Sequence, residues 1–225
     1  MAAASISSRS DGPALATAAN FLFFGGNFII LPVLPLYLVS LGYGESQVGL
    51  VLGVAALCAI CFRLVAGPAV DRWGTKPFLL AGGLMFIAST SSLLVAKTFP
   101  SFVLLRLLHG AGLSLFTTAA GALAANAIPP SRRAEGMGWF GLSGPLGMAL
   151  APAIGGFLLL HTGFRGTFAT AIALAVFSWL TATFIGRATD RGDQDRRTGD
   201  QGFTGGPPPS PPAETPPTDA MPSRP

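Results

Sequence analysis

Four polar or charged side chains lie inside otherwise apolar stretches of this sequence. They are Asn27, Arg63, Arg106 and His109. Burying an ionisable group among apolar side chains is costly, so such a group is a candidate for binding or moving charge. Arg106 and His109 are three residues apart, a spacing that puts two side chains on one face of a helix. We therefore take these four residues as candidates for contact with a small-molecule substrate or a coupling ion.

A structural role would also account for the presence of three of these four residues in apolar segments. Arg63 lies about two helical turns before Asp71, so its long side chain can reach the nearest membrane surface. His109 can be a packing histidine with satisfied hydrogen bonds, and Asn27 can bond to a neighbouring helix. Both explanations stay open for these residues. For Arg106, deeper in its apolar segment, we favour a functional role.

The elements that carry these residues are predicted to be membrane helices. Half of the residues are hydrophobic and only 11% are charged, whereas soluble domains carry about 25% charged residues. The mean hydropathy is +0.57. A spanning helix needs roughly 20 apolar residues. Six segments qualify: Leu15–Leu41, Val48–Val70, Phe78–Ala96, Phe102–Ile128, Met137–Leu160 and Phe164–Gly186. The sequence thus predicts an all-α membrane protein with six transmembrane helices.

The distribution of basic residues predicts the orientation, because cytoplasmic loops are enriched in Lys and Arg. With a cytoplasmic N-terminus, only Lys97 and Arg165 face outward, and Arg63 and Arg106 lie within spans. The other ten of the 14 basic residues are then inside: Arg9, Arg72, Lys76, Arg132, Arg133, Arg187, Arg191, Arg196, Arg197 and Arg224. We expect a multi-pass protein of the cell membrane with both termini in the cytoplasm.

The composition divides the chain into three parts. Residues 1–13 form a cytoplasmic N-terminal segment, and residues 14–186 form the six-span unit. Residues 187–225 are polar and then rich in proline. A segment that buries so little apolar surface is expected to be a disordered cytoplasmic tail.

Several other functions are disfavoured by the residues present. The two histidines, His109 and His161, lie in separate segments without a carboxylate cluster, and Cys58 and Cys61 lie inside an apolar segment. This pattern favours neither a metal site nor a catalytic centre, so we expect no metal, no cofactor and no enzyme activity. The basic residues are scattered, which argues against nucleic acid as a partner. None of the ten acidic residues falls in the middle of a segment, so a membrane-buried carboxylate for proton coupling is missing.

The turn between the second and third segments carries a recognisable pattern. Gly67, Asp71, Arg72, Gly74 and Lys76 form G-x3-D-R-x-G-x-K. This resembles the loop 2–3 signature of the major facilitator superfamily, except that Thr75 replaces a basic residue. The resemblance implies a gating role for Asp71 and Arg72.

Three further patterns resemble the same superfamily, in particular its drug/proton antiporters. Gly26, Pro32 and Pro35 match the first-span signature, and Arg106 with Gly110 matches the fourth-span signature. Gly138, Gly147, Pro152, Gly155 and Gly156 match the fifth-span antiporter pattern, with Ala151 replacing a glycine. Glycines let membrane helices approach closely, and proline within a span frees backbone carbonyls. The resemblance implies proton-coupled efflux of small molecules.

A weak internal repeat fits the same family. Gly67-x6-Gly74-x-Lys76 recurs as Gly156-x6-Gly163-x-Arg165, on the opposite membrane face in the predicted topology. This favours an inverted three-plus-three repeat. The family builds its path between two six-span halves, and the chain provides the N-terminal one. We expect the bilayer, a small-molecule substrate and a second half or a homodimer as partners. A truncated, non-transporting membrane protein or interaction partner and an uptake permease for sugars or organic acids are the alternatives.

Overall fold

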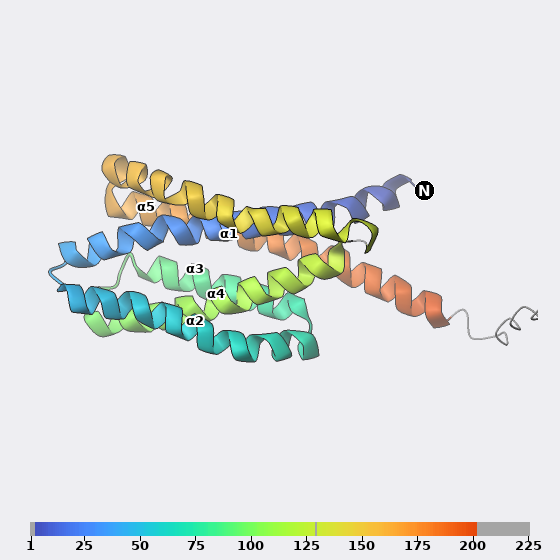
Figure 1. The fold of residues 1–225 in the computed structure, drawn as a ribbon, viewed down its shortest axis with the longest axis horizontal. Coiled ribbons are helices and arrows are strands. Elements are labelled where there is room, and N and C mark those ends of the chain that lie inside the picture. Colours follow the sequence, from blue (N-terminus) through green and yellow to red (C-terminus); the bar gives the residue numbers. More distant parts are fainter. Residues whose placement is uncertain (1–2, 129, 202–225) are drawn as a thin grey trace, which may run out of the picture. The chain divides into compact units, whose positions relative to one another are not determined.

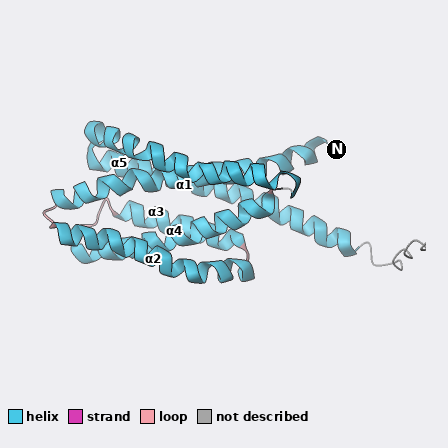
Figure 2. Ribbon diagram, viewed as in Figure 1, coloured by secondary structure: helices cyan, strands magenta, loops and turns pink. Residues whose placement is uncertain are grey.

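The computed structural model describes residues 3–128 and 130–201, and every regular element in these ranges is helical (Figure 2). The long helices are α1 (Ala3–Ser40), α2 (Glu45–Trp73), α3 (Thr75–Ser92), α4 (Phe99–Ala127) and α5 (Arg133–Gln201), with a short 3₁₀ turn η1 at Pro130–Arg132. The chain divides into two compact units, Met1–Asp190 and Arg191–Pro225. The described part of the second unit, residues 191–201, is helical.

Helix α5 reverses direction at Gly163. This glycine has non-helical backbone angles, φ 67° and ψ −173°. Ser143, before the break, accepts a hydrogen bond from Asn20 Nδ2 at 2.8 Å, and Ser178, after it, donates to the carbonyl oxygen of Ala19 at 2.7 Å. Both halves of α5 therefore pack against the same part of α1, as Figure 1 shows for the yellow and orange segments beside the blue helix.

Four helices are long and apolar enough to cross a membrane within the described residues: Gly12–Ser40 of α1, Glu45–Trp73, Phe99–Ala127 and Arg133–Phe184. The last of these, 52 residues long, contains the fifth segment predicted from the sequence and all but the last two residues of the sixth. The 18-residue α3, which covers most of the third predicted segment, is not among the four. Many outward-facing side chains are large and apolar, among them Leu64, Val95 and Leu160. An apolar exterior suits contact with lipid.

Small residues allow the backbones of α3 and α4 to meet. A Cβ added to Gly82 would lie 2.5 Å from the backbone nitrogen of Phe116, and one added to Gly112 would lie 2.8 Å from the carbonyl oxygen of Gly82. Contacts of this kind exclude any side chain larger than hydrogen. Phe23 of α1 stacks on Phe116, with ring centroids 3.9 Å apart, and anchors α1 beside this pair.

The last helix extends beyond the predicted end of the membrane unit. The apolar sequence stops at Gly186, where a disordered tail was predicted to begin, but α5 is helical as far as Gln201. A helix satisfies its backbone hydrogen bonds internally and so can continue where apolar residues end. The remainder of the predicted tail, residues 202–225, lies outside the described residues.

Candidate functional site

A cluster of buried polar side chains joins three helices in the middle of the bundle. Nε2 of His109 on α4 lies 2.9 Å from Oδ1 of Asn27 on α1, and its Nδ1 lies 3.5 Å from Oγ of Ser89 on α3. All three side chains are buried. The structure thus brings together two residues that are 82 positions apart in the sequence, and both were candidates from sequence. Ser89 was missed, because serine within an apolar helix usually bonds only to its own backbone.

The positions of the hydrogen atoms in this cluster follow from the acceptor atoms that face each donor. Asn27 presents an oxygen to His109, so Nε2 carries a hydrogen and donates it. The Ser89 hydroxyl donates to the carbonyl oxygen of Phe86 at 2.9 Å. That hydroxyl hydrogen is therefore not directed at Nδ1 of His109. A neutral His109 leaves Nδ1 without a donor from Ser89.

Arg106 lies one turn before His109 on α4 and is only 5% exposed. Its Nε has no hydrogen-bond partner in the part of the chain that the structure describes, and the same holds for Oγ1 of Thr90 and Oγ of Ser114. Buried arginine is normally paired with an acid. None of the acidic residues in the sequence lies mid-span, so Arg106 has no carboxylate partner among the described residues.

Arg63, the fourth candidate, is separate from this cluster. It is exposed on α2 and donates from its guanidinium to Oγ1 of Thr117 at 3.2 Å. The thiol of Cys58 donates to the carbonyl oxygen of Leu107 and also joins α2 to α4. The bond from Arg63 to Thr117 is a second link between these helices, further toward the C-terminal end of each. Arg63 therefore contributes to the α2–α4 interface and does not neutralise or repel Arg106 directly.

The residues of the loop signature lie where α2 ends and α3 begins. Asp71 and Arg72 are exposed in the last turn of α2, and the Arg72 guanidinium lies 5.5 Å from the centre of the Trp73 ring. Gly74 has a φ of 87°, in the left-handed region that favours glycine, and this lets the chain turn at once into α3. Gly67 faces open space, and Lys76 is half-buried at the start of α3.

The glycines and prolines of the span signatures fall into two groups. A Cβ added to Gly26, Gly147 or Gly155 would lie within 3.1 Å of backbone atoms of a neighbouring helix, and one added to Gly110 would collide with the carbonyl oxygen of Ala55. Gly138 and Gly156 face open space. Pro32, Pro35 and Pro152 lie within continuous helices, with Pro32 and Pro152 exposed.

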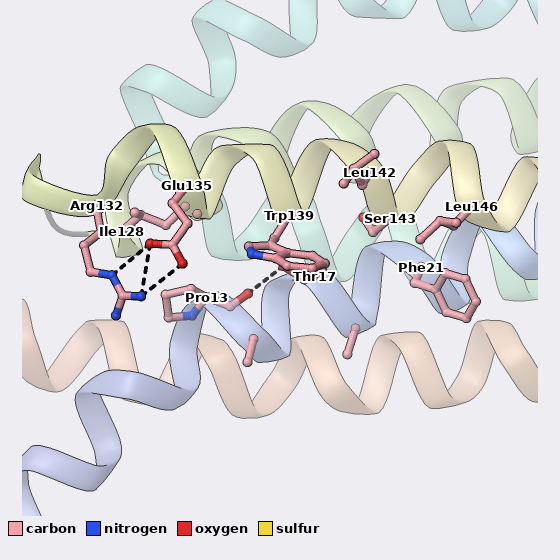
Figure 3. Close-up of a pocket in the computed structure, with 13 residues that line it drawn as sticks. Pro13, Thr17, Phe21, Ile128, Arg132, Glu135, Trp139, Leu142, Ser143 and Leu146 are labelled. Atoms are coloured by element: carbon pink, nitrogen blue, oxygen red, sulfur yellow. Dashed lines mark hydrogen bonds and ion pairs between the residues drawn. The ribbon is translucent and has the colours of Figure 1, made fainter.

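A cavity of about 820 Å³ opens between the start of α1 and the start of α5 (Figure 3). Its polar end holds the Arg132–Glu135 ion pair, 3.0 Å long, and Trp139 and Phe21 form part of its apolar wall. Small-molecule sites have volumes of about 300–1,000 Å³ and mostly apolar walls. Sequence reasoning missed this cavity, because its shape depends on how α1 and α5 pack.

A bundle of apolar helices, joined through glycine contacts and enclosing an unneutralised polar cluster, defines a helical membrane protein of the transport type. The chain belongs to the Major Facilitator Superfamily, whose family model matches residues 16–218. Members of this family are transporters rather than enzymes.

Proteins similar to this chain include drug efflux pumps. The multi-drug resistance efflux pump PmrA of Streptococcus pneumoniae is 29% identical over 162 residues, which are 70% of this chain and 40% of the pump. The quinolone resistance protein NorA of Staphylococcus aureus is 28% identical over 165 residues, which are 73% of this chain and 42% of that protein. The chain therefore spans less than half the length of these relatives.

A solved structure shares the fold. The human organic anion transporter MFSD10 (TETRAN) superposes with a TM-score of 0.61 over 77% of this chain and 46% of that transporter, at 20% sequence identity.

Proposed function

We propose that the chain is the N-terminal six-helix unit of a secondary-active transporter that exports small molecules in exchange for protons. The buried cluster of Asn27, Arg106 and His109 between α1 and α4 is the observation that carries this proposal. Side chains of this type in the membrane interior contact cargo or carry protons in transporters. The family membership and the names of the two efflux pumps support export over uptake.

The lengths of the helices support a proposal of six spans. The 52-residue segment Arg133–Phe184 would be about 78 Å long as a straight helix, against a hydrocarbon core of about 30 Å. Its reversal at Gly163 divides it into two spans. Helix α3, with 18 residues, is about 27 Å long and supplies the remaining span. The proposed order is three spans followed by three inverted ones, with both termini in the cytoplasm, as the distribution of Lys and Arg favours.

We assign the loop between α2 and α3 to gating on the cytoplasmic side. Asp71 is an exposed carboxylate beside the first residues of α3. A carboxylate is stabilised by the partial positive charge of a helix N-terminus, by about 0.3–1 kcal/mol when exposed and up to ~2 kcal/mol when partly buried. A helix end that approaches Asp71 in one state and leaves it in the other would favour the closed state.

A second six-helix unit completes the path. The matched part of each efflux pump is 40–42% of its length, and transporters of this architecture bind cargo between two units. A second copy of this chain or a different unit can fill that place.

Organic anions are a second class of cargo. Arg106 supplies a buried positive charge for which the described helices offer no carboxylate near it. A cluster of this charge attracts an anionic group and repels a cation. Transport of organic acids is therefore the competing form of the proposal.

The proposal is tested in bacterial cells that lack their own drug pumps. The chain is joined to the C-terminal six-span half of NorA, and the efflux of a preloaded fluorescent quinolone is followed with and without a proton uncoupler. We expect efflux that stops on uncoupling. Efflux that continues unchanged after uncoupling would exclude proton coupling, and no efflux from a correctly inserted fusion would exclude export.

A further inference from the structure

We propose that a cavity at the end of the bundle where α5 bends binds the headgroup of an anionic phospholipid from the surrounding membrane. The cavity has a volume of about 620 Å³ and lies between the last turn of α1, the segment after α3 and the bend of α5. The chain passes from α1 to α2 at this same end of the bundle (Figure 1). The inference concerns the binding of lipid and goes beyond the proposed function.

Two basic residues from separate segments line this cavity. Lys97 lies between α3 and α4, and Arg165 follows the bend of α5 by two residues. Both are exposed, and neither side chain has an ion pair or a hydrogen bond within the part of the chain that the structure describes. No other Lys or Arg occurs in the described segments of this end, residues 37–50, 92–102 and 157–168. Both basic residues of this end therefore line one cavity.

The positive charge of the cavity is not balanced by an acid. No Asp or Glu is among the described residues that line it. Glu45, the first residue of α2, is the acid in the described segments of this end, and it is exposed and lies outside the lining. Two positive charges without a carboxylate partner favour an anionic ligand.

Aromatic side chains hold the cavity in place. The ring of Tyr37 lies 5.2 Å, centre to centre, from the rings of both Phe164 and Phe168. The hydroxyl of Tyr37 has no hydrogen-bond partner among the described residues, so it is a third donor available to a ligand. The hydroxyl of Tyr43 donates to the carbonyl oxygen of Lys97 at 3.1 Å, which fixes the backbone that carries this basic side chain.

The rest of the wall is apolar and includes Leu41, Leu93 and Leu94. Beside it, Val95 is 75% exposed on the outside of the bundle. A small inorganic anion would leave this apolar surface in contact with water, whereas acyl chains would cover it. Phosphate groups accept charge-assisted hydrogen bonds from Lys and Arg, and basic pockets between membrane helices bind anionic headgroups. The combination of charge and apolar wall therefore favours a phospholipid over a free phosphate ion.

The experiment is native mass spectrometry of the purified full chain in non-ionic detergent micelles, which gives the dissociation constant of the first bound lipid. Phosphatidylglycerol is the probe. Phosphatidylcholine with the same acyl chains is the control lipid, because its headgroup has no net charge. Glycerol phosphate, an anion without acyl chains, is added as a competitor. Arg133→Gln is the control variant, since it removes one exposed positive charge from the start of α5, at the opposite end of the bundle.

We expect phosphatidylglycerol to bind at least tenfold more tightly than phosphatidylcholine. Lys97→Gln and Arg165→Gln should each weaken the binding of phosphatidylglycerol about fivefold, as expected for one basic residue beside an anionic lipid, and the double variant at least tenfold. Lys97→Arg, which keeps the charge, and Arg133→Gln should stay within twofold of the unmodified chain. A tenfold excess of glycerol phosphate over lipid should displace none of it.

Three results would overturn the inference. The first is equal affinity for the two lipids, and the second is a loss in Arg133→Gln as large as in the double variant. The third is displacement by glycerol phosphate, which would mean that the cavity binds a small phosphate anion. The substituted side chains are exposed, and circular dichroism establishes that each variant is folded. The measurement needs neither a proton gradient nor a second six-helix unit, so it fails separately from the proposed function.

Discussion

At the scale of residues, hydrogen bonds between helices link the interior of the bundle. Asn27 and His109 link α1 to α4, Asn20 and Ser143 link α1 to α5, and Trp179 donates to the carbonyl oxygen of Leu80 on α3 at 3.0 Å. In lipid such bonds contribute modestly, about 0.6 kcal/mol on average. Leaving one partner buried and alone costs more, about 1–3 kcal/mol.

This asymmetry predicts different effects for two changes at His109. His109→Leu leaves the Asn27 carbonyl oxygen without a donor and should lower the free energy of unfolding by about 1–3 kcal/mol. His109→Gln retains an N–H donor and should lower it by less than half as much. Unfolding in mixed micelles measures both. Equal losses in the two variants would mean that the bond to Asn27 contributes nothing.

Residue types were predictable from the sequence, and their partners were not. Asn27, Arg106 and His109 stand out because they are polar within apolar segments. That His109 meets Asn27, while Arg63 meets Thr117 instead, depends on the rotation of each helix about its axis. An apolar pattern on every face of a membrane helix leaves that rotation undetermined.

At the scale of elements, glycine decides which helices meet. Gly110 brings α4 against α2 at Ala55, and Gly147 and Gly155 bring α5 against α1. The sequence signatures identified these three glycines, but they also included Gly138 and Gly156, which face open space. Gly82 and Gly112, which join α3 to α4, belong to no signature and were missed.

Alanine substitutions should separate the two groups of glycines. A methyl group at Gly110 collides with the backbone of Ala55, so Gly110→Ala should destabilise the chain by about 1–3 kcal/mol. Gly156→Ala, helical and in open space, should be neutral or stabilising by up to about 1 kcal/mol. Thermal unfolding in detergent compares the two. A Gly110→Ala chain as stable as Gly156→Ala would contradict the close packing of α2 and α4.

The α2–α3 turn is predicted to matter for motion more than for stability. Asp71 is exposed, so Asp71→Asn should leave insertion and unfolding unchanged. In the fusion with the second half of NorA, the same change should slow quinolone efflux about two- to fivefold, because the closed state loses a charge contact of about 0.3–1 kcal/mol. Arg9→Gln, a change of charge near the N-terminus, serves as the control. Unchanged efflux in Asp71→Asn would exclude the gating role.

At the scale of the whole molecule, apolar runs predicted where helices lie but not how they are joined. Each of α1 to α4 begins before its predicted segment, and most of each predicted segment lies within its helix. The sequence predicted two segments in the region of α5, and the structure has two helical stretches there that meet at Gly163, whose backbone is not helical. The sequence also ended this run at Gly186, while the helix continues to Gln201. Hydropathy predicts which side chains contact lipid, and it does not predict whether a helix continues into water.

The topology has a direct prediction. With six spans and ten basic residues inside against two outside, a reporter fused after Arg187 should lie in the cytoplasm, and one inserted at Thr162, in the turn beside Gly163, should lie outside. A fluorescent reporter that matures only in the cytoplasm and a phosphatase active only outside give the two readouts. Phosphatase activity after Arg187 would contradict an even number of spans.

The central claim is that this six-helix unit transports only together with a second unit. The measurement is the accumulation of a fluorescent quinolone and of a lipophilic cationic dye in liposomes with an imposed pH gradient. The purified chain alone is compared with the chain fused to the second half of NorA. We predict accumulation of the quinolone by the fusion, abolished when the gradient is collapsed, and none of either compound by the chain alone. Gradient-driven accumulation of the cationic dye by the chain alone would contradict it.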